Sequence, residues 1–312
     1  MDSRRDTEKT VVLDRCPACD AQSRDPSWAL SREHLQLWRC RSCGVMYSDP
    51  QPREEVRRRY LHDYDLGDHF GAVAARKRVL FERRLDRLPT PGTLGTALCD
   101  VGSGDGLFLE LAAERGWEGV GIELNPPAVR RARSRGLDVI EGPVEDLAHL
   151  PQEHFDLVTA WDAIEHTPEP RRFARRLAQL VTPGGVVAVS TLNRRSAVAA
   201  VFRSRWSMVA ADHFTLWDRG SLGRLLESVG LSVEAVRYYG LGRDFFCLVD
   251  RAWNVRTRAR EAGGRLDWTT GAGVLAAEDL VNRVLNATHA GVEIEVIAQR
   301  SGRRRGSAKD RG

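Results

Sequence analysis

A glycine-rich turn between an expected strand and an expected helix constrains the fold of this chain more than any other feature. Residues Leu98–Val101 are typical of the end of a buried strand, and glycines follow at positions 102, 104 and 106. The helical pattern behind them stops at Gly116,. Glycine lets a ligand approach bare backbone, and a new helix presents free N–H groups to it. The turn therefore predicts a binding site for a small ligand.

Two acidic residues indicate which ligand this turn binds. Asp100 precedes the first glycine, and Glu123 ends the next expected strand, where a carboxylate can accept hydrogen bonds from two ribose hydroxyls,. A dinucleotide-binding turn would need glycine at position 107, which is leucine here,. Asp100 also suits an amino or cationic ligand better than a pyrophosphate. The stretch resembles the first motif of the class I S-adenosylmethionine (SAM) methyltransferases, which reads acidic-x-Gly-x-Gly-x-Gly.

The resemblance covers residues 95–192 closely and implies an α/β fold. Strand and helix patterns alternate there, as a parallel, doubly wound sheet requires. We expect a Rossmann-like class I methyltransferase sheet of seven strands with helices on both faces. Pro143 stands where many members carry Asp, so Glu145 or backbone groups would bind the adenine amine. The residues that the resemblance implies for SAM are Asp100, Gly102, Ser103, Gly104, Gly106, Glu123, Leu124, Glu145, Trp161 and Asp162.

Turn and capping residues predict the limits of neighbouring elements. Asn125, followed by two prolines, is expected to cap a helix that runs to Gly136,. The Thr-Pro-Gly-Gly turn at 182–185 is expected to end one helix and to precede a strand, Val186–Ser190. Val292–Ala298 suits the last strand of the sheet.

Two C-x-x-C pairs near the N-terminus predict a structural zinc ribbon. The pairs are Cys16 with Cys19 and Cys40 with Cys43, and short apolar strands are expected before and after the second pair,. Disulfides are disfavoured in a reducing compartment, and a redox site needs only one pair. Four thiolates close the coordination sphere of zinc, so the metal should not be catalytic. The module resembles the ribbon that precedes many bacterial SAM methyltransferases of small-molecule and polysaccharide pathways.

These patterns predict four parts of the chain. Residues 1–52 form the zinc ribbon, and residues 53–94 form a helical linker in which Tyr60 and Tyr64 lie near the ligand entrance. Packing on the main domain is the simpler role for this linker, although family members often use the region as a lid. Residues 95–300 form the methyltransferase domain, of which about 194–230 would cover the substrate. Residues 301–312 form a basic, disordered tail.

Composition restricts the cellular setting and the partners. Hydrophobic residues make up 42% and charged residues 29% of the 312, and no apolar run reaches the length of a membrane helix,. The first residues lack the apolar core of a signal peptide, so we expect a cytoplasmic protein with no membrane span. The 47 basic and 43 acidic residues give a net charge of +4, which is too balanced to indicate a nucleic-acid binder,.

The function expected from the resemblance is SAM-dependent methylation of a small molecule, most simply at oxygen. Sugars, polysaccharide precursors and secondary metabolites are the candidate acceptors. The alternative is an RNA methyltransferase that uses the ribbon to dock RNA. A third alternative is a SAM-binding protein without chemistry. The sequence does not identify the acceptor or the oligomeric state.

Three residues are candidates for removing the acceptor's proton. His166 and Glu165 follow the fourth strand, and His213 lies in the segment that would cover the acceptor. If Asp162 begins a helical turn, Glu165 and His166 share its face. Alternatively, Glu165 caps the helix and His166 bonds to backbone. Resemblance to quinone-pathway O-methyltransferases offers a further alternative, in which Asp162, Glu165 and His166 hold a divalent cation.

Overall fold

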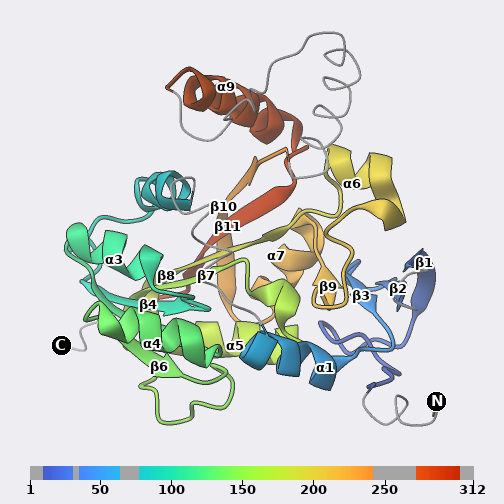
Figure 1. Cartoon of the computed structure of the whole chain (residues 1–312), viewed down its shortest axis with the longest axis horizontal. Coiled ribbons are helices and arrows are strands. Elements are labelled where there is room, and N and C mark those ends of the chain that lie inside the picture. The colour runs from blue at the N-terminus through green and yellow to red at the C-terminus, as the bar shows by residue number, and fades with distance from the viewer. Residues whose placement is uncertain (1–9, 31–34, 64–76, 242–271, 303–312) are drawn as a thin grey trace, which may run out of the picture.

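The computed structural model describes residues 10–30, 35–63, 77–241 and 272–302. A seven-stranded sheet forms its centre (Figure 1). In sheet order the strands are β10 (Leu231–Tyr239), β11 (Glu293–Arg300), β8 (Val181–Leu192), β7 (Phe155–Trp161), β4 (Ala97–Val101), β5 (Glu118–Glu123) and β6 (Asp138–Glu141). Strand β11 is antiparallel to both β8 and β10, and the pairs from β8 to β6 are parallel. The predicted seven-stranded α/β fold is therefore confirmed.

Helices bury the apolar residues of both faces of this sheet. On one face pack α3 (Leu107–Glu114), α4 (Pro126–Ser134) and the helical residues 77–85. On the other face pack α5 (Pro170–Leu180) and α7 (Arg219–Glu227). α9 (Ala272–Thr288) packs on β10. Among the helices of the described residues, none combines the length and the apolar character that crossing a bilayer requires,.

Local sequence signals set most of the element limits. The Asn125 side chain accepts a hydrogen bond from the Ala128 amide at 2.9 Å, so the predicted N-cap of α4 is confirmed,. Strand β8 begins earlier than predicted, at Val181. Phe155 pairs with Val181, but Leu157 pairs with Val186, so the Pro-Gly-Gly residues form an irregularity inside the strand rather than a turn before it,.

The N-terminal module forms a second, antiparallel sheet. Its strands are β1 (Arg24–Leu30), β2 (Leu35–Cys40), β3 (Met46–Ser48) and β9 (Thr215–Leu216). The strands on either side of the second cysteine pair were predicted, whereas β1 and β9 were not. β9 belongs to the segment predicted to cover the substrate, so this sheet joins two distant parts of the chain.

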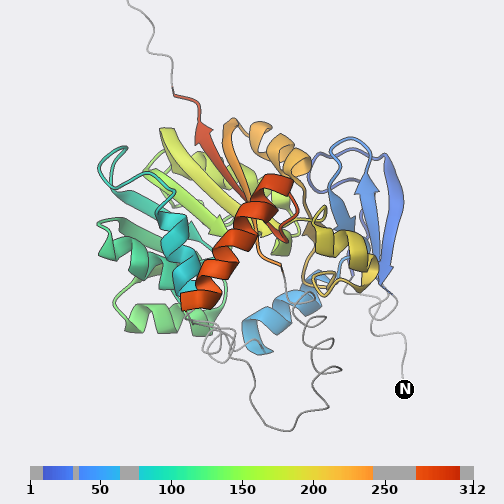
Figure 2. The same cartoon turned by 90° about the horizontal axis from the view of Figure 1, so that it is seen from above.

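The segment around β9 also shares an apolar cluster with the N-terminal module. Leu37 and Met46 of that module pack with Val198, Trp206 and Leu216. Val198 lies in α6 (Ala197–Phe202), which is followed by η4 (Arg203–Arg205). Figure 2 shows α6 beside the blue strands of the module. The module is therefore packed onto the main domain rather than tethered to it.

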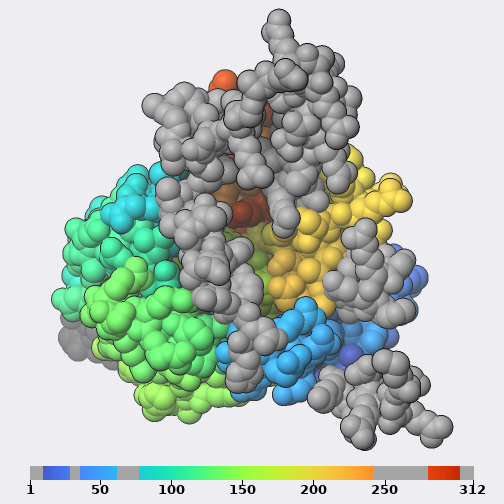
Figure 3. Space-filling view, in the orientation of Figure 1, coloured from blue at the N-terminus to red at the C-terminus, as the bar shows by residue number. Residues whose placement is uncertain are grey.

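The linker begins with α1 (Arg53–Arg58) and η2 (Arg59–Asp63). In Figure 3 the blue residues of α1 border the green residues of the main domain, where Arg53 donates a hydrogen bond to the Pro168 carbonyl at 3.5 Å. Tyr64 and most of the basic tail lie outside the described residues. So do residues 242–271.

Candidate functional site

The glycine turn lies at the carboxyl edge of the sheet, where β4 gives way to α3. Strand order reverses between β4 and β7, and ligands of open α/β sheets bind at such a switch point,. Gly102, Gly104 and Gly106 have φ angles of 78°, 57° and 86°, which side-chain-bearing residues rarely adopt,. A Cβ at Gly106 would lie 2.4 Å from Leu137. The turn therefore requires glycine for its backbone shape, and the Leu137 side chain fills the space beside Gly106.

Glu123 holds this turn together from the end of β5. The side chain is buried, and its carboxylate accepts hydrogen bonds from the Gly104 and Asn125 amides, each at 2.7 Å. The Tyr60 hydroxyl donates to the same carboxylate at 2.8 Å. Asn125 in turn donates to the Tyr60 carbonyl. Tyr60, which the sequence placed near the ligand entrance, thus contacts the carboxylate assigned to the ribose.

Asp100 is the acidic residue in front of the glycines. It is buried and accepts a hydrogen bond from the Thr159 hydroxyl at 2.6 Å. Burial raises the pKa of Asp100 to about 7, and the nearby Glu123 carboxylate adds to that shift,. The Ser103 hydroxyl is also buried and has no hydrogen-bond partner among the described residues. A carboxyl group with a raised pKa and an unpaired hydroxyl are therefore buried beneath the glycine turn.

The other residues predicted for SAM lie around the same edge. Leu124 is half-buried next to Glu123. Glu145 accepts a hydrogen bond from the Thr167 hydroxyl at 3.0 Å, and burial raises its pKa. The Trp161 ring is buried at the end of β7, with its centroid 5.3 Å from that of Phe108.

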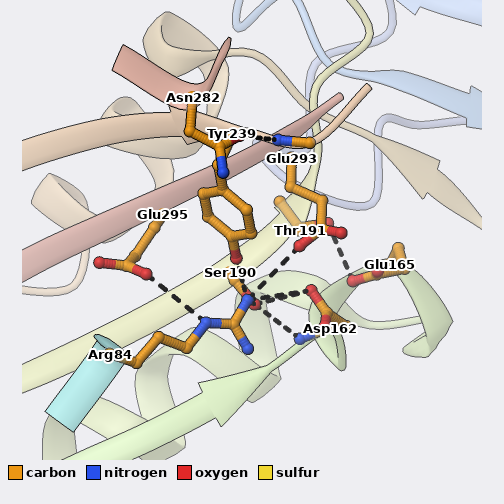
Figure 4. A network of polar contacts seen from close by, with 10 residues as sticks. Arg84, Asp162, Glu165, Ser190, Thr191, Tyr239, Asn282, Glu293 and Glu295 are labelled. Atoms are coloured by element: carbon orange, nitrogen blue, oxygen red, sulfur yellow. Dashed lines mark hydrogen bonds and ion pairs between the residues drawn. The ribbon is translucent and has the colours of Figure 1, made fainter. Parts of the chain in front are cut away.

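A buried arginine organises a polar network that sequence reasoning missed (Figure 4). Arg84 is fully buried and donates hydrogen bonds to Ser190, at 3.0 Å, and to the Tyr239 hydroxyl. It forms ion pairs of 3.5 Å with both Glu293 and Glu295. Its guanidinium lies 4.4 Å from the centre of the Trp161 ring,. Burial and the nearby Asp162 raise the pKa of Glu293 to about 8.

This network reaches the site through Asp162. The Ser190 hydroxyl donates to the Asp162 carboxylate at 2.7 Å, and the Asp162 amide donates back to that hydroxyl at 3.0 Å. Burial lowers the pKa of Lys77, while Asp162 and Asp105 oppose that shift. Several arginines occur in helical residues 77–85, and nothing in the sequence distinguishes the buried Arg84 from the others. Glu293 and Glu295 did carry a signal, because they share one face of the stretch Val292–Ala298, whose other residues are apolar,.

The prediction that Asp162 begins a helical turn shared with Glu165 and His166 is wrong. Asp162 has a φ of 51° and precedes a 3₁₀ turn, η3 (Ile164–His166). Glu165 points inward and accepts a hydrogen bond from the Thr191 hydroxyl at 2.8 Å, whereas His166 is exposed. Adjacent residues of a tight turn face different sides. These three side chains do not form a common cation site in the described residues.

The structure instead brings the two candidate histidines together. The ring centroids of His166 and His213 are 4.7 Å apart. His166 Nδ1 donates to the Asp212 carbonyl at 2.9 Å, and His213 Nδ1 donates to the Met208 carbonyl at 2.6 Å. Because a carbonyl only accepts, each Nδ1 carries a proton, so in the neutral form of either ring Nε2 is the atom that can accept one.

The four cysteines predicted as metal ligands also converge. The Sγ atoms of Cys16 and Cys43 lie 3.7 Å apart, and those of Cys19 and Cys40 lie 3.5 Å apart. All four lie within 4.8 Å of one another. These separations exclude disulfides, whose sulfurs are about 2.05 Å apart. They fit a tetrahedron of thiolates around zinc, in which a Zn–S bond of about 2.3 Å sets sulfurs about 3.8 Å apart.

Comparison with known families identifies the class to which this site belongs. A family model described as a methyltransferase domain matches residues 73–236. That match covers more than half of the chain and includes the glycine turn, Glu123 and His166. The chain therefore belongs to this methyltransferase family, and its fold is that of the class I SAM-dependent enzymes.

Two named relatives are similar to part of this chain. A protein of Alkalilimnicola ehrlichii named ubiquinone biosynthesis O-methyltransferase is 34% identical over an alignment 161 residues long, which covers 46% of this chain and 65% of the relative. The protein of that name from Nitrosospira multiformis is 31% identical over an alignment 172 residues long, which covers 48% of this chain and 72% of the relative. Less than half of this chain thus aligns with either relative.

One solved structure shows the same fold. It is a SAM-dependent methyltransferase from Thermotoga maritima described as a possible histamine N-methyltransferase. Its TM-score is 0.51 at 15% identity, and the match covers 80% of this chain and all of the other.

Proposed function

We propose that this chain transfers the methyl group of SAM to a hydroxyl oxygen of a small molecule. The carrying observation is the pair of histidines, His166 and His213, at the same sheet edge as the glycine turn. Relatives named as O-methyltransferases support oxygen as the acceptor atom. Sugars, polysaccharide precursors and secondary metabolites remain the proposed acceptor classes.

In this proposal the carboxyl edge of β4, β5 and β7 holds SAM. Glu123 would bind the ribose hydroxyls, and Asp100 would favour the cationic end of the molecule. When bound, SAM supplies an electrophilic methyl group for in-line displacement, so that most of the catalysis is alignment. The residues proposed to contact SAM are Asp100, Gly102, Ser103, Gly104, Gly106, Glu123, Leu124, Glu145, Trp161 and Asp162.

The histidine pair would take the proton of the acceptor hydroxyl. Burial and the neighbouring His166 lower the pKa of His213, which favours a neutral imidazole that can accept a proton,. We propose His166 as the base, with His213 as the competing candidate. Where His213 takes the proton, Glu165 would support its charged imidazole, because the Glu165 carboxylate interacts electrostatically with His213.

Single histidine variants test this assignment. His166→Ala and His213→Ala are assayed for SAM binding by calorimetry and for methyl transfer with tritiated SAM and a metabolite extract. The exposed His154 supplies the control variant, His154→Ala. Loss of the base should lower the rate by about 10²–10⁴ with SAM binding intact. Near-normal rates in both variants would contradict histidine catalysis, and inhibition by a mild chelator reversed by magnesium would favour a cation instead.

We also propose that the cysteines hold one structural zinc and that the chain divides near residues 52, 94 and 300. The sulfur separations support the zinc, and the closed set of four thiolates leaves it no position for substrate. The sheet formed by β1, β2, β3 and β9 crosses the first of these limits, because β9 comes from the proposed substrate-covering segment, 194–230.

A further inference from the structure

The short strand β9 pairs with a strand of the N-terminal module, and the residue after it, Trp217, forms an isolated parallel bridge with Asn193, just past the end of β8 of the main sheet. β9 is the edge strand of the module's sheet, where Met46 pairs with Leu216 and Tyr47 with Thr215. The Ser48 amide donates a further hydrogen bond to the Phe214 carbonyl at 3.0 Å. Backbone bonds from β3 therefore fix three consecutive residues of the substrate-covering segment.

The opposite side of β9 contacts the turn that carries His166. Thr215 is fully buried, and its hydroxyl donates to the Ile164 carbonyl at 3.4 Å. Ile164 begins η3, and His166 ends it. The Trp217 indole donates to the Thr215 hydroxyl at 3.0 Å. Strand β9 thus lies between the N-terminal module and one of the two candidate catalytic histidines.

The other histidine is placed by the residues just before β9. His213 precedes Phe214, whose carbonyl is bonded to Ser48, and its ring lies against that of His166. Asp212, one residue earlier, accepts the hydrogen bond from His166 Nδ1. A displacement of β9 would therefore move both groups that contact His166.

One arginine joins this arrangement to the cysteine cluster. Arg224 of α7 donates to the Cys43 carbonyl through Nε, at 3.2 Å, and through Nη2. Cys43 is followed by Gly44 and Val45 and then by Met46, the first residue of β3. Zinc bound by four thiolates carries two net negative charges, so a guanidinium beside the ligand turn also complements it electrostatically.

We infer that the zinc ribbon supports the segment that carries His213, and that β3 and Arg224 act as positioning elements for this histidine. This inference rests on the proposed methyl transfer, because that reaction is what gives the placement of His213 a function. The experiment below does not measure methyl transfer. Removing zinc, or the Arg224 guanidinium, releases the turn at Cys43, loosens β3 and β9, and frees His213 from His166. The glycine turn and Glu123 are held by separate bonds, so SAM binding should persist.

The test uses the full chain and two structural readouts. Arg224→Ala, Arg224→Lys and the wild type are compared by amide hydrogen exchange over residues 45–49 and 212–218, and by the imidazole NMR signals of His166 and His213. The control is Arg219→Ala, which removes an exposed arginine of the same helix. We expect Arg224→Ala to speed exchange of both segments about tenfold or more and to shift both imidazole signals. Arg224→Lys should restore part of the protection, because lysine keeps the charge but not the fork of donors.

Stepwise removal and return of zinc gives the second arm. Protection of residues 212–218 should fall as zinc leaves and return in proportion to the zinc restored, while calorimetry shows SAM affinity within about twofold of its starting value. Exchange and imidazole signals that stay unchanged in Arg224→Ala and in zinc-free protein would overturn the inference. A failure of methyl transfer alone would count against the proposed function, since no readout here depends on turnover.

Discussion

At the scale of single residues, Glu123 should decide SAM affinity. Glu123→Ala removes a charged acceptor that would accept hydrogen bonds from two ribose hydroxyls. Each such hydrogen bond is worth about 1.5–3 kcal/mol. We expect SAM affinity, measured by calorimetry, to fall at least tenfold. Glu118→Ala, at the exposed start of the same strand, is the matched control and should bind SAM normally. Unchanged affinity in Glu123→Ala would contradict the assignment.

Asp100 should make stability depend on pH. Its pKa is raised from 3.8 to about 7 in the folded chain. Between these values the unfolded carboxyl is ionised while the folded one keeps its proton. The unfolded chain therefore binds fewer protons, and this group's contribution to stability falls as pH rises from about 4 to 7. The buried carboxyls Glu165 and Glu293 have raised pKa values too, so the comparison must isolate Asp100.

Asp100→Asn provides that comparison, since the amide oxygen can still accept the bond from Thr159. Urea unfolding at pH 5 and pH 7 should show a smaller loss of stability in the variant than in the wild type. SAM, which brings positive charge to this site, should bind the wild type more tightly as pH rises over the same range. Equal pH slopes in both proteins would contradict the assignment of the shift to Asp100.

The sequence pointed to residues that stand at a fixed distance from a recognisable turn. It did not point to residues whose importance depends on tertiary contacts. Asp100, Glu123 and the glycines between them stand at fixed offsets from one strand end, because backbone geometry requires it. Arg84 carries no such offset. It lies in a helix with other arginines, and only packing against Trp161, Tyr239 and the β11 acids makes it the buried one.

At the scale of elements, the two cysteine pairs should bind one zinc ion, and the fold of the N-terminal module should depend on it. Cys40→Ser removes one of four thiolate ligands and should abolish stoichiometric zinc binding, because three ligands hold zinc less tightly. Metal analysis of protein purified without chelator should find about one zinc per wild-type chain and markedly less in the variant. Cys99→Ser is the control, since that cysteine is buried in β4 away from the cluster. Full zinc content in Cys40→Ser would contradict the proposal.

The limits of element prediction appear in the same region. The strands flanking Cys40 and Cys43 followed from apolar runs around a turn. Strand β9 could not be predicted, because it is two residues long and its partner, β3, lies far away in sequence. The Thr-Pro-Gly-Gly residues at 182–185 do interrupt regular structure, but they do so as an irregularity in the pairing of β8 with β7 rather than as a turn before the strand.

At the scale of the whole molecule, the charge balance argues against RNA as the acceptor. The net charge of +4 comes from 47 basic and 43 acidic residues, and many arginines are paired with acids within the fold. Binding through phosphates would require unpaired cations and would weaken steeply with salt. In the sheet of the ribbon, β9 also pairs with the side of β3 that would otherwise be an open edge. We therefore expect weak binding of structured RNA at physiological salt, without methyl incorporation.

Two measurements on one preparation check this expectation. Tritiated SAM is incubated with total RNA and, separately, with a metabolite extract, and filter binding to structured RNA is measured from low to high salt. A variant ending at residue 302 removes Arg303, Arg304 and Arg305, so any binding by the basic tail alone disappears with it. Small-molecule methylation without RNA labelling supports the proposed function. Tight, salt-sensitive RNA binding that survives in the shortened chain, together with labelled RNA, would replace it with RNA methylation.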